Sequence, residues 1–346
     1  MELYVFDHAR NLAGIMESFE YLRWTRRYSA CGAFELKAIA TPENTSLLQL
    51  GNFLWKNNDE EAGIIEHLEL SQTEREIITV SGRFATSILA RRIIWATETL
   101  NGGLSTCVQT LLNQHLINPS DTNRRIGFVS CSTGSSIVSV NTQISYKNLM
   151  EAVTGLCDTA DVGIKTVFSP IAKNFTVTLY EGAVSQAVFS REYENLTEQT
   201  YTQNNTGTAN TALVGGEGEG VDRTFVSIIG DSGEERREVF VDAKDLRQED
   251  FGSGYAAALT FRGQSKLSEL AMIQSFDAAV NPHGNLQYKM DFDLGHIVQV
   301  ISKKWGVTLT ARITEIEESY DTGGQSLNIV FGRGVLSFMQ MLKGGF

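Results

Sequence analysis

A three-strand pattern occurs twice in this chain, first in residues 51–83 and again in residues 295–333. In each copy one glycine precedes the first strand, a second precedes the next, and the third strand ends in Val-x-Gly-Arg. Glycine-bounded hairpins are common, so a chance match is the alternative. We favour duplication, because four landmarks recur in the same order and an internal repeat is the signature of one structural unit used twice. The pattern predicts two similar folds with these glycines in equivalent places: Gly51 and Gly295, Gly63 and Gly306, Gly82 and Gly332.

Composition limits the class of protein. A chain of 346 residues exceeds one typical hydrophobic core, so we expect two or more domains. The net charge of −12 argues against a surface that grips the phosphates of nucleic acids. The four cysteines are far apart, which is typical of a protein made in a reducing compartment. No apolar run is long enough to cross a membrane, so we expect no membrane anchor.

Residues 1–92 predict a first antiparallel β-barrel. Six segments are rich in β-branched and aromatic residues and are bounded by residues that favour turns. Strands at this spacing favour a closed or nearly closed barrel. The six segments are residues 3–6, 19–28, 33–40, 53–57, 63–70 and 76–81.

Residues 93–186 predict an α+β module with two helices. Apolar residues follow helical spacing from Leu104 to Leu116, and a second helix is expected after Ser145 as its N-cap. Residues 187–346 return to strand patterns and predict a second barrel, with a short helical insertion near 244–276. The apolar segment Val335–Phe346 is expected to need a partner surface. The predicted fold class is mainly β, with two antiparallel barrels and α+β insertions.

No motif in the sequence supplies chemistry. The phosphate-binding glycine loops, HExxH and GxSxG are missing, and the five histidines are scattered. The sequence therefore predicts no metal and no cofactor. Two carboxylate pairs, Glu217 with Glu219 and Asp291 with Asp293, are the nearest candidates for a hydrolase site. A solvated loop and a polar strand face explain them more simply, so we predict that the protein is not an enzyme.

Several segments resemble the Gp37-like tail proteins of siphoviruses, which form the hub of the tail or baseplate. Their order and spacing carry the resemblance, which covers about residues 20–333. One departure is His296, where the resemblance leads us to expect an acidic residue. The matching segments are residues 24–36, 62–66, 80–82, 91–93, 205–223, 241–246 and 291–298.

The resemblance implies a structural role in a virion. Such hubs are trimers whose chains each carry two barrels related to the tail-tube fold, so that three chains present six barrels to a hexameric ring. Implied partners are two further copies of the chain, a distal tail or tail-tube hexamer, the tape-measure protein, and a tip or fibre protein. The chain would be made in the bacterial host cytoplasm and become part of the tail tip of a phage, prophage or bacteriocin-like particle. A negative inner wall would let DNA pass without stable binding.

The duplication also predicts where neighbouring barrels touch. An acidic loop in the first copy would lie at the same barrel end as a basic loop in the second, so that opposite charges alternate around the ring. An ordinary solvated turn is the alternative for either loop. The candidate ring-contact residues are Asn57, Asp59, Glu60, Glu61, Lys303 and Lys304.

Two other functions remain open at this point. A tail-associated peptidoglycan hydrolase would use one of the carboxylate pairs, and clearing of cell walls in a zymogram would reveal it. A host-carbohydrate binding module would stack sugars on exposed rings such as Trp55 and Trp305, which a glycan-binding assay would detect. Both tryptophans lie in or beside strand patterns, where a core or interface position is more usual.

Overall fold

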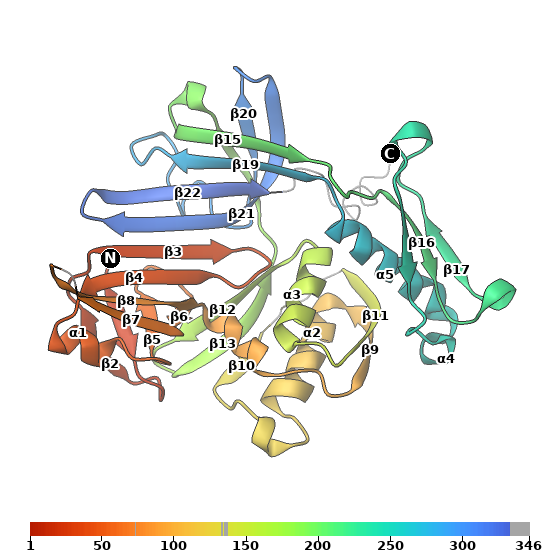
Figure 1. Cartoon of the computed structure of the whole chain (residues 1–346), viewed down its shortest axis with the longest axis horizontal. Helices are drawn as coiled ribbons and strands as arrows, with labels where there is room; N and C mark the ends of the chain where they lie inside the picture. The colour runs from red at the N-terminus through yellow and green to blue at the C-terminus, as the bar shows by residue number, and fades with distance from the viewer. Residues whose placement is uncertain (73, 133, 135–137, 333–346) are drawn as a thin grey trace.

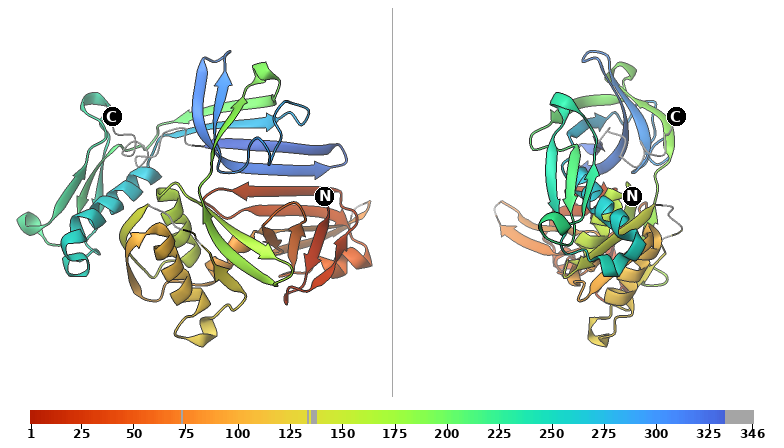
Figure 2. Two further views of the ribbon diagram at one scale, coloured as in Figure 1. Left: turned by 180° about the vertical axis from the view of Figure 1, so that it is seen from behind. Right: turned by 90° about the vertical axis from the view of Figure 1, so that its right-hand side faces the viewer.

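The computed structural model describes residues 1–332, apart from residues 73, 133 and 135–137. Its main feature is a row of antiparallel strands drawn from both ends of the chain (Figure 1). An α+β module lies beside this sheet, and a smaller sheet with its own helix lies at one end (Figure 2). The mainly β fold is therefore confirmed. Arg333 and Val335–Phe346 lie outside the described residues.

Eight strands follow one another in the main sheet in the order β15-β19-β22-β21-β3-β4-β8-β7. The first four come from the C-terminal part of the chain, and we call them the C-terminal unit: β15 (Leu196–Asn204), β19 (Ile273–Val280), β22 (Gly324–Gly332) and β21 (Val307–Asp321). The other four form the N-terminal unit: β3 (Tyr21–Arg27), β4 (Ala33–Ile39), β8 (Glu76–Arg83) and β7 (His67–Gln72). The two units meet where β21 pairs with β3.

Further strands extend each unit. Beside the N-terminal unit is a four-stranded sheet in the order β2 (Leu12–Met16), β1 (Leu3–Phe6), β5 (Phe53–Lys56) and β6 (Ala62–Ile64). In the C-terminal unit, β20 (Ile297–Ser302) pairs with the first half of β21, and β14 (Val184–Phe189) pairs with β20. The strand pairs of the described residues do not form a closed ring, so the two barrels stay a prediction from the sequence.

The duplication is visible in the strand pairing. β15-β19-β22-β21 and β3-β4-β8-β7 have the same chain order and the same antiparallel partners. Gly51 and Gly295 both have positive φ, 81° and 84°, two residues before the equivalent strands β5 and β20. Glycine adopts this backbone conformation without the steric cost that other residues incur. This landmark pair therefore marks equivalent positions.

The other two landmark pairs were wrong in detail. The break between β6 and β7 corresponds to the irregularity between Ile313 and Glu315 in β21, which makes His67 equivalent to Glu315. By this register Gly63 is equivalent to Ala311, and Gly306 lies in the turn before β21. Gly82 is equivalent to Phe331, one residue before Gly332. Residue spacing hid these shifts because the hairpin between β20 and β21 is longer than that between β5 and β6.

The middle of the chain forms the predicted α+β arrangement around one hydrophobic cluster. Ser145 is not the N-cap of its second helix, because the side chain of Asn148 accepts hydrogen bonds from the N–H groups of Met150 and Glu151. The elements of this middle part of the chain are η1 (Ala85–Arg91), β9 (Thr97–Gly103), α2 (Leu104–Leu112), η2 (Asn113–Ile117), η3 (Thr122–Arg124), β10 (Val129–Cys131), β11 (Ser139–Ser145), α3 (Leu149–Thr159), β12 (Gly163–Ser169) and β13 (Asn174–Tyr180).

The insertion in the C-terminal half is larger than predicted. A separate sheet of β17 (Phe225–Ile228), β16 (Thr211–Gly215) and β18 (Glu238–Asp242) precedes the helices α4 (Gln248–Phe251) and α5 (Tyr255–Glu269). Sheet and helix α5 share one hydrophobic cluster. The helical part ends at Glu269, and residues 273–280 form β19. The short helix α1 (Pro42–Leu47), with Thr41 as its N-cap, was not predicted.

Candidate assembly surface

The main sheet is amphipathic across all eight strands. On one face, alternate residues such as Leu22, Phe34 and Val80 are buried in the cluster of the N-terminal unit. Phe276, Ile316 and Ile329 continue this face into the cluster of the C-terminal unit. The intervening residues lie on the opposite face, since side chains alternate along a strand. The sheet therefore has one packed face and one polar face that runs across both units.

Acidic side chains outnumber basic ones on the polar face. Ion pairs cross it from strand to strand, such as Arg23 with Glu35 at 3.0 Å and Arg27 with Glu315 at 2.6 Å. By strand register, the acidic residues on this face are Glu35, Glu69, Glu198, Asp277, Glu315, Glu317 and Asp321, and the lysine and arginine residues are Arg23, Arg27, Lys37, Arg83 and Arg312. Negative charge on a continuous surface repels the phosphate backbone of nucleic acids.

The two edges of the sheet present unpaired backbone. Within the described part of the chain, β7 pairs with β8 and β15 pairs with β19, each on one side only. Such edges are templates for pairing with another chain. Leu70 on β7 points to the packed side of the sheet with Ile78, yet 56% of its surface is exposed. The β7 edge therefore carries an exposed apolar side chain on the packed side of the sheet.

The predicted contact loops lie at equivalent places but differ in exposure. One loop joins β5 to β6 and the other joins β20 to β21. Asn57, Glu60, Lys303 and Lys304 are exposed. Asp59 and Glu61, in contrast, are buried and face groups of their own chain. Their carboxylates were predicted to be available to a neighbouring subunit, and that part of the prediction was wrong.

Each exposed loop residue also has a local contact. Asn57 exchanges hydrogen bonds with Glu2, and Glu60 forms an ion pair with Lys165. The backbone N–H groups of Lys303 and Lys304 donate to Glu192, and the ammonium group of Lys303 lies over the ring of Tyr193, 5.7 Å from its centre.

Asp59 belongs to a buried charged network that joins the two units. Its carboxylate lies 3.7 Å from Arg26, 3.8 Å from Lys289 and 4.0 Å from Lys56. The indole N–H of Trp24 also donates to it at 3.1 Å. Burial opposes ionisation of Asp59, but the surrounding cations hold its pKa below the usual value. Asp59 is thus the ionised centre of the network.

Lys56 and Glu318 form the second centre of this network. Lys56 Nζ lies 2.6 Å from Glu318 Oε2, and both side chains are almost completely buried. The hydroxyl groups of Tyr288 and Tyr320 donate to Glu318 at 3.3 and 2.5 Å. Since Lys56 is on β5 and Glu318 on β21, this ion pair connects the N-terminal and C-terminal units.

Glu61 is the buried carboxyl group that sequence reasoning could not distinguish from a surface charge. Burial, together with the negative charge of Asp59, raises its pKa to about 8. The backbone N–H of Thr166 donates to Glu61 Oε1 at 3.3 Å. Glu61 is therefore protonated at neutral pH and acts as a neutral group between the N-terminal unit and β12.

We expect Glu61→Gln to flatten the dependence of stability on pH. Between pH 4.5 and 8 the unfolded chain ionises Glu61 while the folded chain keeps its proton, so stability decreases as pH rises through this window. Glutamine resembles the protonated carboxyl group and does not titrate. Denaturant unfolding of both proteins at pH 5 and pH 8 measures the difference. An equal pH dependence in wild type and variant would contradict the assignment.

The candidate catalytic carboxylates have structural partners. Asp293 pairs with Arg26 at 2.8 Å, and Asp291 accepts the backbone N–H of Gln287 at 2.7 Å. Glu217 accepts the backbone N–H of Gln248, and Glu219 is exposed and lies 3.8 Å from Lys244. Asp293 thereby joins the network at the junction of the two units, a role that its sequence position did not reveal.

The two candidate tryptophans differ. Trp55 packs against Tyr4, Phe6 and Phe168, and its N–H donates to the carbonyl oxygen of Asp59. It is a partly buried packing residue. Trp305 is exposed in the turn before β21 and contacts Phe276 on one side. A sugar-stacking role has no support at Trp55.

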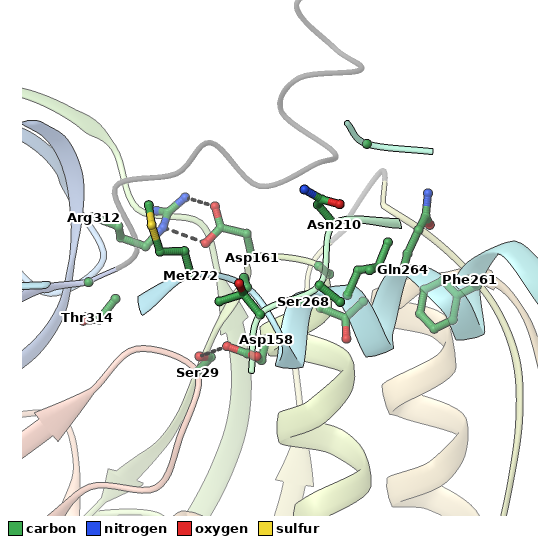
Figure 3. Close-up of a pocket in the computed structure, with 18 of the residues that line it drawn as sticks. Ser29, Asp158, Asp161, Asn210, Phe261, Gln264, Ser268, Met272, Arg312 and Thr314 are labelled. Carbon is green, nitrogen blue, oxygen red and sulfur yellow. Dashed lines mark hydrogen bonds and ion pairs between the residues drawn. The ribbon is translucent and has the colours of Figure 1, made fainter. Parts of the chain in front are cut away.

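A cavity of about 660 Å³ lies where the C-terminal unit, α3 and α5 meet (Figure 3). Arg312 on β21 donates to both carboxylate oxygens of Asp161, at 2.9 and 2.6 Å. The hydroxyl group of Ser29 donates to Asp158 at 3.3 Å. These hydrogen bonds connect β21 and the turn after β3 to the end of α3. The cavity therefore lies at a contact between the main sheet and the α+β module.

Two searches of the described residues complete the description of the site. No group of three or more His, Cys, Asp or Glu side chains in this part of the chain is placed to hold a metal ion. No helix in the same part is both long enough and apolar enough to cross a membrane.

The fold is that of phage and prophage tail proteins. Three crystal structures, each with a TM-score of 0.64, resemble this chain along nearly its whole length. The 43 kDa tail protein of prophage MuSo2 from Shewanella oneidensis is 14% identical, and the match covers 96% of this chain and 99% of that one. The tail protein from Neisseria meningitidis MC58 is 12% identical, with 98% of each chain covered. Prophage tail protein gp18 from Listeria monocytogenes EGD-e is 13% identical, with 99% of each covered.

The chain belongs to the Siphovirus ReqiPepy6 Gp37-like protein family, whose model matches residues 2–333. The resemblance drawn from the sequence motifs is thereby confirmed. No curated protein matches this sequence.

Proposed function

We propose that the protein is the hub of a phage or prophage tail tip, in which three chains form a ring. The observation that carries this proposal is the repeated strand order, because one chain supplies two equivalent four-strand units in one continuous sheet. Three chains then supply six units, which matches a six-fold tail-tube or distal tail ring on one side and a three-fold tip or fibre protein on the other. Closed rings require such matching of symmetry at their interfaces.

The polar face of the main sheet would line the central passage of this ring. Its excess of carboxylates supports that orientation, since DNA or the tape-measure protein could pass without a basic surface to hold the nucleic acid. Asn57, Glu60, Lys303 and Lys304 would be positioned by equivalent hairpins and would alternate around the ring as contacts between neighbouring units of the ring. The family and fold favour this structural role over hydrolysis.

Measurement of the particle mass and a cryo-EM map of the purified full chain test the proposal. We expect a particle of three chain masses and a ring with six similar units around a channel. A stable monomer at all accessible concentrations, both alone and mixed with the hexameric ring protein of the same tail, would overturn it. A trimer whose channel is lined by another part of the chain instead of the polar face would contradict the assigned orientation.

A further inference from the structure

We propose that the α+β module carries a docking surface for a short acidic segment of another protein. Residues 91–95, 121–125 and 146–151 form this surface, and we call it the basic–aromatic surface. One of its elements, η3, lies at the end of the module farthest from the main sheet (Figure 1). The inference goes beyond the proposed ring and does not depend on it, because no strand of the main sheet takes part.

Hydrogen bonds hold the three segments of this surface together. The guanidinium group of Arg92 donates to the carbonyl oxygen of Arg124 at 2.6 Å. The guanidinium group of Arg124 donates in turn to the carbonyl oxygen of Ile93, also at 2.6 Å. The third segment joins the first through the backbone, since the N–H of Ile94 donates to the carbonyl oxygen of Lys147 at 2.9 Å. Residues that are distant in sequence therefore form one surface.

Positive charge dominates the basic–aromatic surface, although the whole chain has a net charge of −12. In the described part of the chain, none of its lysine and arginine side chains forms an ion pair with a carboxylate within 4.0 Å. The carbonyl groups that accept from Arg92 and Arg124 are neutral, so these charges remain available to an anion outside the chain. The five cations are Arg91, Arg92, Arg124, Arg125 and Lys147, and the two carboxylates in the same segments belong to Asp121 and Glu151.

Exposed apolar side chains lie among these cations. Trp95 is 59% exposed, Tyr146 is 73% exposed and Ile93 is 42% exposed. The guanidinium group of Arg124 lies over the ring of Trp95, 4.4 Å from its centre, and so holds the ring in place. Tryptophan, tyrosine and arginine are the residues that contribute most often to binding energy at protein interfaces. The composition of this surface is therefore that of a protein-binding site.

Tyr146 provides an independent observation. Its φ of 53° lies in the left-handed region, which an aromatic residue adopts at a steric cost. Packing inside the chain offsets little of this cost, since the side chain is mostly exposed. Strained backbone is concentrated at functional sites, where the strain helps to position a side chain. We infer that the backbone at Tyr146 is kept in this conformation to present the ring to a partner.

An acidic protein segment fits this surface better than a nucleic acid or a membrane. Ile93 offers an aliphatic contact, which an apolar side chain of a protein can complement and a phosphate backbone cannot. DNA and anionic bilayers are extended, so they would also approach the acidic remainder of the chain and be repelled by it. A short segment touches the basic–aromatic surface alone. Such a segment would carry carboxylates for the arginines and an apolar side chain for the two rings.

Fluorescence anisotropy with labelled peptides tests the proposal on the full chain. One probe has four Glu-Glu-Leu repeats, and in the matched probe glutamine replaces each glutamate. We expect the acidic peptide to bind and the glutamine peptide not to bind. Arg91→Glu/Arg125→Glu and Trp95→Ala should each weaken binding by about tenfold or more. The control Arg75→Glu/Arg247→Glu changes the net charge equally at exposed arginines outside the surface, and it should bind like the wild type.

Tyr146→Gly separates a binding role from a structural one. Glycine adopts positive φ without steric cost, so the variant should bind the acidic peptide more weakly while its unfolding midpoint is unchanged or higher. A lower midpoint with unchanged binding would show that Tyr146 serves the fold, and it would contradict the assigned role.

Four other results would overturn the proposal. Binding of neither peptide would exclude an acidic segment of this kind. Equal binding of both peptides, or an equal loss in the control variant, would show only non-selective attraction. Tighter binding of single-stranded DNA of the same charge would assign the surface to nucleic acid, and tighter binding of vesicles that contain phosphatidylserine would assign it to a membrane. None of these results bears on the ring, which the particle mass tests separately.

Discussion

Glu318→Leu is expected to lower the free energy of unfolding by about 3–5 kcal/mol, the range observed when one partner of a buried ion pair is removed. The substitution leaves the ammonium group of Lys56 buried, with Asp59 at 4.0 Å as its remaining anion. It also removes the acceptor of the Tyr288 and Tyr320 hydroxyl groups. Denaturant unfolding followed by circular dichroism measures the change, with the midpoint shifted at an unchanged slope.

The double variant Lys56→Met/Glu318→Leu is the matched control for this expectation. Replacing a whole buried ion pair by apolar residues is often neutral or stabilising, so the second substitution should restore most of the lost stability. Asp59 keeps its ion pair with Arg26 in this variant. A double variant as unstable as the single one would show that Glu318 acts through the tyrosine hydroxyl groups, and a stable single variant would show that the ion pair contributes little.

The network explains why the two units sit in a fixed register within one sheet. A shift of one residue between β21 and β3 would turn Glu318 to the polar face and place Lys56 against apolar neighbours. An unpaired buried ion is strongly unfavourable. The free-energy cost of such a shift is therefore higher than the loss of apolar packing alone would make it. The intrachain junction can thus act as a fixed template for the whole assembly.

The repeat and the mainly β fold could be predicted from the sequence because both depend on local signals. A single sequence shows the alternation of apolar residues and the glycines at turns. Gly51 and Gly295 are such glycines, and both have positive φ in the structure. The landmarks failed where their spacing depends on the length of the strands in a hairpin. Gly306 lies in a longer hairpin than its presumed counterpart Gly63, and no local pattern records that difference.

The shared sheet and the buried charges could not be predicted, since both depend on contacts distant in sequence. Arg26 meets Asp293 across 267 positions, and Lys56 meets Glu318 across 262. In the sequence Asp59 and Glu61 are part of an acidic turn, which is normally solvated. Only the folded chain places cations around Asp59 and the backbone N–H of Thr166 against Glu61. The sequence pattern likewise indicated a strand at β7, but it did not show that this strand lies at the edge of the sheet.

Leu70→Lys is expected to prevent ring formation while leaving the single chain folded. Leu70 is 56% exposed in the chain, so its replacement removes little intrachain packing. In a ring that closes through the β7 edge, however, the lysine would be buried at the interface without a carboxylate partner. Lysine on an edge strand is a common device by which proteins block edge-to-edge pairing. Particle mass should fall from three chains to one, with an unchanged unfolding midpoint for the monomer.

Leu12→Lys separates this effect from a general effect of added charge. Leu12 is 54% exposed on β2, an edge of the four-stranded sheet beside the N-terminal unit, so the exposure and the chemical change are closely matched. Because β2 lies outside the main sheet, this variant should still form three-chain particles. If both variants dissociate, added surface charge accounts for the loss and the β7 edge has no special role. If Leu70→Lys still yields trimers, the ring closes through a surface other than the β7 edge, because a lysine ammonium at a closed β7 edge would be buried without a counter-ion.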